Sequence, residues 1–162
     1  MDELSQRILR LFDELGRESL DLHAFFELAG GNRPNEQDAV LAAANEMVAR
    51  GWLRAASSDF YARTETGRLA LAGPLDVTLY TRRSCHLCDE AKASIAPLLR
   101  EFGAPLREVD IDADPELRAR YAEEVPVIFL GSRKVAKYRV DPAEFRRQLE
   151  RARDGSPPLT SG

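Results

Sequence analysis

The pattern of apolar residues changes at Gly73-Pro74, and this change constrains the fold more than any other feature of the sequence. Before it, apolar side chains recur at helical spacing, whereas after it short apolar runs alternate with helical segments. A chain of 162 residues is long enough for two small domains. We therefore predict one domain over residues 1–73 and a second over residues 74–154. Residues 155–162 show no periodicity and are predicted to be a disordered tail.

The first predicted domain is mainly helical. Its apolar periodicity and glycine stops indicate helices over about residues 4–15, 22–29 and 35–50, followed by strands over residues 52–55 and 60–63 that form a hairpin. This order, together with the run from Tyr61 to Arg68 and the apolar Leu69-Ala70-Leu71 after it, resembles a bacterial winged-helix domain. The resemblance implies a mainly α, winged-helix-like fold of three helices and a β-hairpin.

The second predicted domain follows the order strand-helix-strand-helix-strand-strand-helix. The expected strands cover residues 75–80, 106–111 and 125–130, with a return strand after Gly131, and the expected helices begin near Cys85, at Pro115 and at Pro142. Strands joined by crossover helices are expected to pair in parallel and to lie buried at the centre of the sheet. We therefore predict an α/β, thioredoxin-like fold (βαβαββα) with a central mixed sheet.

Cys85 and Cys88 are the only cysteines, and they lie at the start of a predicted helix. A cysteine at a helix N-terminus faces free backbone N–H groups and the positive end of the helix dipole, which favour the thiolate. Arg82 and Arg83 add positive charge nearby. Since Cys88 lies one turn along the same helix face, the pair can form a disulfide. We expect Cys85 to attack a substrate disulfide and Cys88 to resolve the mixed disulfide.

Other interpretations of the two cysteines stay open. The pair can be half of a zinc site, but zinc needs two more ligands, and the only histidines are His23, in the other domain, and His86. We therefore predict no metal ligands. The cysteines could also be incidental core thiols, or Cys85 from each of two subunits could hold a metal or an iron–sulfur cluster.

Val125-Pro126 opens a strongly apolar predicted strand. Proline cannot donate a hydrogen bond to a neighbouring strand, so its place here needs another reason. A cis peptide bond would explain it, because cis bonds are mainly a property of proline. The alternative is a proline that simply begins a strand.

The Cys-x-x-Cys at a strand-to-helix junction, the proline about forty residues later and the interleaved helices together resemble the glutaredoxin branch of the thioredoxin-like family. The resemblance covers about residues 75–153. It implies that Cys85 is the nucleophile, that Cys88 is the resolving thiol and that Pro126 is a cis-proline beside them.

The resemblance also implies residues that bind substrate or modulate the thiols. The backbone of Val125 would dock the substrate, and Arg82 would pair with a glutathione carboxylate, although a solvated surface charge is the alternative for Arg82. His86 stands where the family commonly has proline, and we expect it, with Arg83, to stabilise the neighbouring thiolate. Residues 135–141 lack the glycine pair with which the family holds glutathione. Glutathione is therefore a candidate reductant, and no bound cofactor is expected.

These observations predict a thiol–disulfide oxidoreductase that transfers electrons to protein or small-molecule disulfides. The first domain is expected to be an interaction module. One candidate interaction is the formation of a homodimer through this domain. The alternative function is a redox-sensing, DNA-binding transcriptional regulator with the cysteine pair as its switch. The net charge of −4 and a predicted third helix with one arginine against three acids argue against tight binding to phosphates. Only Arg54, Arg63 and Arg68 flank the predicted hairpin.

The sequence favours the cytoplasm and predicts no membrane partner. No apolar run approaches the roughly 18 residues of a membrane span. Residues 1–7 are too charged for a targeting peptide. A single Cys-x-x-Cys is typical of a reducing compartment rather than of a disulfide framework.

Overall fold

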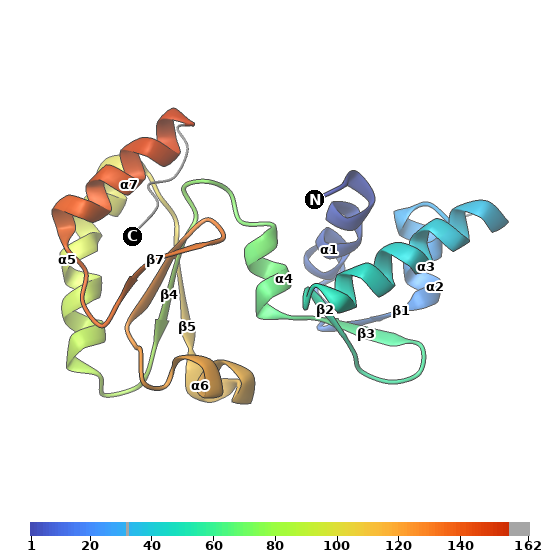
Figure 1. The fold of residues 1–162 in the computed structure, drawn as a ribbon, viewed down its shortest axis with the longest axis horizontal. Helices are drawn as coiled ribbons and strands as arrows, with labels where there is room; N and C mark the ends of the chain where they lie inside the picture. Colours follow the sequence, from blue (N-terminus) through green and yellow to red (C-terminus); the bar gives the residue numbers. More distant parts are fainter. Residues whose placement is uncertain (32, 156–162) are drawn as a thin grey trace. The chain divides into compact units, whose positions relative to one another are not determined.

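A computed structural model describes residues 1–31 and 33–155 (Figure 1). The chain divides into two compact units, Met1–Leu71 and a second that begins at Ala72, and each has its own hydrophobic core. The predicted disordered tail lies outside the described residues, except for Gly155, whose left-handed backbone ends the last helix. In the part of the chain that is described, no helix has both the length and the apolar character needed to cross a membrane.

The N-terminal unit combines helices with a small antiparallel sheet. Its elements are α1 (Glu3–Leu15), β1 (Ser19–Asp21), α2 (Leu22–Ala29), α3 (Pro34–Ala49), β2 (Leu53–Ala55), β3 (Phe60–Arg63) and α4 (Glu65–Ala70). The strands lie in the order β1-β3-β2 and are all antiparallel. Sequence patterns anticipated the first three helices and the β2–β3 hairpin but missed β1. This strand holds one buried apolar residue, Leu20, and its backbone hydrogen bonds come from β3, some forty residues later.

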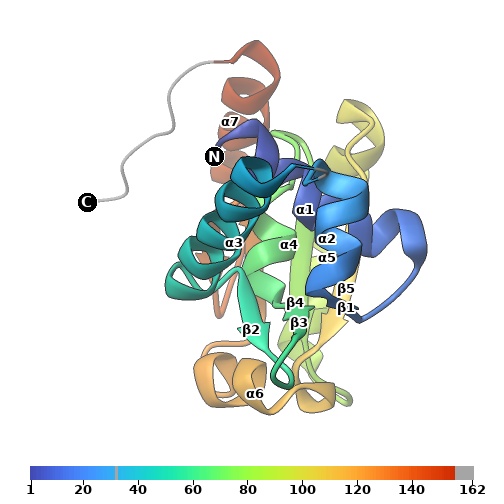
Figure 2. The same ribbon diagram turned by 90° about the vertical axis from the view of Figure 1, so that its right-hand side faces the viewer.

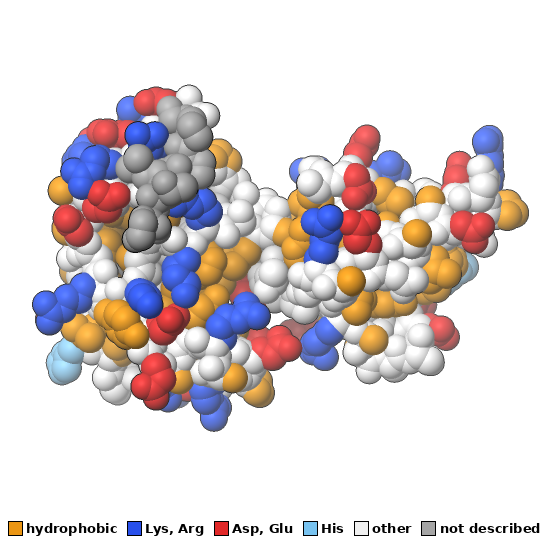
Figure 3. All heavy atoms as spheres, in the orientation of Figure 1, with side chains coloured by type: hydrophobic (Ala, Val, Ile, Leu, Met, Phe, Trp, Pro, Cys, Tyr) orange, Lys and Arg blue, Asp and Glu red, His pale blue; other side chains and the backbone are white. Residues whose placement is uncertain are grey.

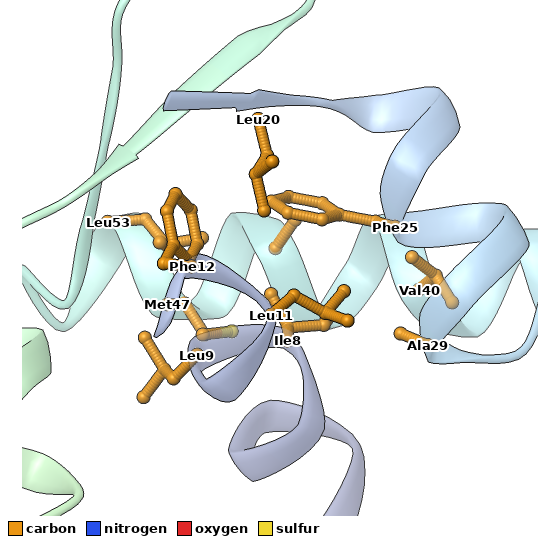
Figure 4. Close-up of a cluster of buried hydrophobic side chains, with 11 residues drawn as sticks. Ile8, Leu9, Leu11, Phe12, Leu20, Phe25, Ala29, Val40, Met47 and Leu53 are labelled. Carbon is orange, nitrogen blue, oxygen red and sulfur yellow. The ribbon is translucent and has the colours of Figure 1, made fainter. Parts of the chain in front are cut away.

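Figure 2 shows the helices and strands of this unit as ribbons from a second side. Apolar side chains from its first three helices and its sheet form its core (Figure 4). Phe25 of α2 lies between Phe12 of α1 and Tyr61 of β3, with ring centroids 6.1 and 5.7 Å away. Local polar residues set where two helices begin, because Asp2 and Asp21 each accept a hydrogen bond from the backbone N–H three residues later.

Arg63 of β3 joins the sheet to α1. Its side chain is only 5% exposed, and its guanidinium donates to the carbonyl of Leu9 at 2.9 Å and to the carboxylate of Asp13 at 2.8 Å. It also lies over the ring of Phe12, 5.7 Å from the centroid. A buried arginine needs such partners, since an unpaired charge is costly to bury. Arg63 is therefore a structural residue. It lies in the hairpin, as expected, but its buried side chain is not available to contact phosphates.

The C-terminal unit is built on a mixed sheet of four strands in the order β5-β4-β6-β7. Its described elements are β4 (Val77–Thr81), α5 (His86–Phe102), β5 (Leu106–Asp110), the 3₁₀ turn η1 (Ile111–Ala113), α6 (Pro115–Tyr121), β6 (Val127–Leu130), β7 (Arg133–Lys137) and α7 (Pro142–Asp154). β4 is parallel to β5 and antiparallel to β6, which is antiparallel to β7. The predicted α/β fold with a mixed sheet is confirmed.

The expected parallel pairing across crossover helices is correct for β4 and β5 but wrong for β6. Helix α6 has only 7 residues, about 10 Å at 1.5 Å per residue, which is too short to carry the chain back along the sheet. It stays at the end where β5 stops (Figure 1), so β6 enters from that end and runs antiparallel to β4.

Helices α5 and α7 lie together on one face of the sheet (Figure 1). Ile95 of α5 and Leu149 of α7 are fully buried against Leu79 and Ile128 of the sheet. At the surface, Arg146 of α7 donates two hydrogen bonds of 2.7 Å to the carboxylate of Glu101 on α5. This packing fixes α5, whose N-terminal end carries the cysteines, on the sheet.

Candidate functional site

Several strand ends meet at one edge of the C-terminal sheet. β4 and β5 both end there, with Thr81 opposite Asp110. β6 begins and β7 ends there too, since Tyr80, Val127 and Lys137 form one cross-strand row. The connections from β4 to α5 and from β7 to α7 leave the sheet at this edge, in the lower part of the unit in Figure 1. We call it the disulfide edge and define it as residues 81–88, 110–112, 124–127 and 137–139.

Cys85 and Cys88 form a disulfide at the start of α5. Their Cα atoms are 5.3 Å apart, within the range for disulfides and consistent with one helical turn. Cys85 is the N-cap of α5, and its Sγ accepts a hydrogen bond of 3.2 Å from the backbone N–H of Cys88. Cys88 is 2% exposed, whereas Cys85 is half-buried. An incoming sulfur atom therefore reaches Cys85 more readily than Cys88.

The arginines before the disulfide are paired with carboxylates at the end of β5. Arg82 contacts Asp112 through Nε at 3.2 Å and Nη2 at 3.1 Å, and Arg118 of α6 lies 3.4 Å from the same carboxylate. Arg83 is 91% exposed, with Nε 3.9 Å from Asp110. Sequence analysis missed these aspartates. The signal was present, because Asp110 lies in the strand predicted to pair with the one before the cysteines and Asp112 lies directly after that predicted strand.

The Val125-Pro126 peptide bond is cis and lies at the disulfide edge. Pro126 is buried and Val125 is half-buried. The backbone N–H of Tyr138 donates to the carbonyl of Pro126 at 3.0 Å and to that of Glu124 at 3.1 Å. These hydrogen bonds tie the segment before β6 to the residue after β7, and sequence analysis did not single out Tyr138.

The side chain of Glu124 is held by two lysines of β7. Its carboxylate lies 3.0 Å from Nζ of Lys134 and 3.7 Å from Nζ of Lys137. The hydrogen bond from Lys134 holds the pKa of Glu124 below its ordinary value, and the positive charges of both lysines act in the same direction. Between the cysteines, His86 and Leu87 are exposed.

Known proteins resemble this unit. Residues 76–150 match the family model described as Glutaredoxin-like domain (DUF836). The uncharacterized protein Rv0508 of Mycobacterium tuberculosis is 32% identical over 87 residues, which cover 51% of this chain and 90% of that protein. Through these residues the chain belongs to the glutaredoxin-like family.

The glutaredoxin-like unit also resembles solved structures. Protein Ne2328 from Nitrosomonas europaea is 29% identical and covers 43% of this chain and 85% of its own, with a TM-score of 0.40. Glutaredoxin from Brucella melitensis is 35% identical and covers 49% of this chain and 79% of its own, with a TM-score of 0.33. The family match begins at residue 76 and does not extend into the N-terminal unit.

The disulfide edge of the glutaredoxin-like unit brings together the site residues predicted from the sequence: Arg82, Arg83, Cys85, His86, Cys88, Val125 and Pro126. The structure adds Asp112, Glu124 and Tyr138 to their surroundings. Within residues 1–31 and 33–155, no group of three or more His, Cys, Asp or Glu residues is placed to hold a metal ion. The roles of the individual residues stay predictions.

Proposed function

We propose that this chain is a thiol–disulfide oxidoreductase whose redox-active dithiol is Cys85 and Cys88. The observation that carries the proposal is their disulfide at the N-terminus of α5, in which Cys85 is half-buried and Cys88 almost fully buried. The membership of residues 76–150 in a glutaredoxin-like family supports the same chemistry. An accessible attacking sulfur and a buried resolving sulfur are what dithiol exchange requires.

The reaction begins with the reduced protein. The Cys85 thiolate attacks one sulfur of a substrate disulfide, the substrate S–S bond breaks, and a mixed disulfide forms. The other substrate sulfur leaves as a thiolate and takes a proton from solvent. The Cys88 thiolate then attacks Sγ of Cys85, releases the second substrate thiol and restores the Cys85–Cys88 disulfide. The substrate gains two electrons and two protons. An external thiol reductant then supplies two electrons and two protons to the protein and reduces the Cys85–Cys88 disulfide again.

Charge and backbone groups at the disulfide edge support the role of Cys85 as nucleophile. The first turn of α5 supplies free N–H groups and the positive end of the helix dipole. Arg82 and Arg83 add positive charge, which Asp112 and Asp110 partly offset. We assign the remaining roles as follows: His86 modulates the thiolate, and Val125 and Pro126 present backbone groups to the substrate.

Glutathione is one candidate reductant in this proposal, and a dithiol donor is the other. Arg82 supports glutathione, because its guanidinium is partly exposed and could pair with a carboxylate. The sequence around the end of β7 supports a dithiol donor, since Lys137 and Tyr138 occupy the region without a glycine pair. The steady-state rates at which glutathione and dithiothreitol reduce the Cys85–Cys88 disulfide distinguish the two candidate reductants.

For the N-terminal unit we propose a winged-helix-like interaction module. The order of three helices and a hairpin, with β1 completing a three-stranded antiparallel sheet, supports this assignment. Helix α3 carries acidic side chains and exposes Leu41 and Val48, which supports a protein partner, such as a second copy of the chain, over DNA. Light scattering of the full chain tests dimerisation.

We place the whole protein in the cytoplasm, where a thiol reductant maintains the dithiol.

Trapping of a reaction intermediate tests the proposed redox function. Cys88→Ser should accumulate a mixed disulfide with a substrate protein, because the resolving thiol is gone. Cys85→Ser is the matched control and should trap nothing under the same conditions. Mass spectrometry after non-reducing electrophoresis measures the adduct. Equal trapping by the two variants, or by neither, would contradict the assigned roles.

A further inference from the structure

Exposed hydrophobic side chains of the C-terminal unit occur at the disulfide edge. Within residues 72–155, the large hydrophobic side chains that are exposed are Leu87 at 39% and Tyr138 at 45%. Leu87 lies between the two cysteines, and Tyr138 follows β7. A single exposed apolar residue is ordinary, but their occurrence at the one edge that carries the disulfide points to a contact surface.

The backbone marks the same edge independently. Among residues 1–31 and 33–155, the non-glycine residues with positive φ are Ser84 at 56° and Tyr138 at 64°. Ser84 immediately precedes Cys85. The left-handed region of backbone conformation disfavours residues other than glycine, asparagine and aspartate. Other residues that adopt it concentrate at functional sites. The fold thus keeps a tyrosine in a conformation that suits glycine better.

Tyr138 is held firmly at its backbone while its ring stays accessible. Its N–H donates to the carbonyls of Glu124 and Pro126. Nζ of Lys137 lies 5.4 Å from the ring centroid, a cation–π contact that covers one face of the ring. Because the backbone of Tyr138 is fixed and Lys137 restrains its ring, the side chain loses little conformational freedom when it contacts a partner, which favours binding.

A hollow of about 370 Å³ lies next to this residue, between β7 and the start of α7. Lys137 and Arg139, the neighbours of Tyr138 in the chain, line it together with apolar Val140 and Phe145. In Figure 3, the visible face of the C-terminal unit, on the left, shows hydrophobic surface interspersed with Lys and Arg side chains and with Asp and Glu side chains. A hollow of this size has room for side chains of a bound polypeptide.

We infer that Tyr138 is a specificity-determining residue that, together with Leu87, contacts the polypeptide around a substrate disulfide. This inference rests on the proposed oxidoreductase function and names its substrate class: a disulfide in a polypeptide with apolar residues beside the cystine. A small disulfide needs to reach only Sγ of Cys85. A polypeptide also covers Leu87 and Tyr138, so apolar burial stabilises its complex selectively.

Substrate selectivity of the full chain tests this inference. Dithiothreitol supplies electrons, and kcat/KM is measured for reduction of insulin and of bis(2-hydroxyethyl) disulfide. Tyr138→Gly suits the positive φ and removes only the side chain, whereas Tyr138→Phe keeps the ring. Phe60→Ala is the matched control, because Phe60 is an aromatic residue with 44% exposure in the N-terminal unit.

We expect the ratio of kcat/KM for insulin to that for the small disulfide to fall about five- to tenfold in Tyr138→Gly, mainly through KM, as for loss of an aromatic contact in an interface. Tyr138→Phe and Phe60→Ala should keep the wild-type ratio. An unchanged ratio in Tyr138→Gly, or an equal loss with both substrates, overturns the inference and leaves the redox function standing. A wild-type protein that reduces neither disulfide overturns both. If circular dichroism shows that Tyr138→Gly does not fold, the same ratio of kcat/KM values is measured for Tyr138→Asn, and its result decides the inference.

Discussion

The backbone N–H of Cys88 donates a hydrogen bond to Sγ of Cys85 across 3.2 Å. The donor belongs to the first turn of α5, whose N–H groups have no partner within the helix. After reduction, the same donor favours negative charge on Cys85. Sγ of Cys88 has the opposite surroundings, because Cys88 is only 2% exposed and burial disfavours a thiolate. The helix start thus makes two cysteines three residues apart chemically different.

This asymmetry predicts different alkylation rates for the two cysteines. In reduced Cys88→Ser, the remaining Cys85 should react rapidly with iodoacetamide near neutral pH, because the free N–H groups at the helix start favour its thiolate. In reduced Cys85→Ser, Cys88 should react slowly and only at higher pH. Rates measured against pH for both variants give the two apparent pKa values. If the rates and pKa values agree, the argument from the helix terminus fails, and the assigned roles of the cysteines fail with it.

Arg82 is predicted to influence Cys85 more than Arg83 does. Arg82 is held at the disulfide edge by Asp112, whereas Arg83 is 91% exposed and screened by water. Arg82→Ala should raise the pKa of the Cys85 thiol in the reduced protein and slow turnover of anionic disulfides. Arg83→Ala is the matched control and should have a smaller effect. Titration of the thiolate absorbance in the Cys88→Ser background measures both. No change for Arg82→Ala would make Arg82 a surface charge only.

The N-terminal unit is predicted not to bind duplex DNA tightly. Arg63 is buried against α1, which leaves Arg54 and Arg68 as the exposed arginines beside the hairpin. Since non-specific affinity depends on the number of neutralised phosphates, we expect a Kd weaker than about 1 μM at ~150 mM salt. Fluorescence anisotropy with a labelled duplex measures it. Tighter, salt-dependent binding that Arg54→Ala abolishes would instead favour the DNA-binding regulator.

Gly67 is predicted to be essential for the packing of α4 against the backbone of Trp52, the residue before β2. A Cβ atom at this position would lie 2.2 Å from the carbonyl oxygen of Trp52, which is backbone and cannot turn away. Gly67→Ala should therefore destabilise the N-terminal unit by about 1–3 kcal/mol, the usual cost of overpacking. The fluorescence of Trp52, the single tryptophan, reports urea unfolding of this unit. Exposed Arg68→Ala, on the same helix, should change the midpoint far less; equal midpoints for the two variants would contradict the predicted clash.

Glu124 is predicted to make the stability of the C-terminal unit depend on pH. Its pKa in the folded protein is lowered from its ordinary value of 4.5 by the hydrogen bond from Lys134. The stabilisation is therefore complete above pH 4.5 and is lost as the pH falls through the folded pKa. Glu124→Gln should lower the Tm at pH 7 and approach wild type in acid. Lys134→Met should show the same pattern by calorimetry. A difference in Tm that does not change with pH would exclude this ion pair as the cause.

Much of the local structure could be predicted because its causes lie within a few residues. Asp2 and Asp21 cap the helices that follow them, and Gly16 and Gly30 end α1 and α2. The same holds for the cysteines: the predicted helix start near Cys85 is confirmed, with Cys85 as the N-cap of α5 and Cys88 in its first turn. Periodicity could not reveal β1, because a strand with one apolar residue depends on a partner elsewhere in the chain.

The sequence by itself determined where helices begin, where the thiols lie and which proline directly precedes β6, since capping, the helix dipole and proline geometry act locally. Tertiary structure alone decided that β6 runs antiparallel to β4, because that depends on how far the short α6 can carry the chain. It also decided that Asp112 pairs with Arg82 and that Tyr138 joins the disulfide edge. These relationships arise where strands distant in sequence end at a common edge, and no local pattern encodes which residues meet there.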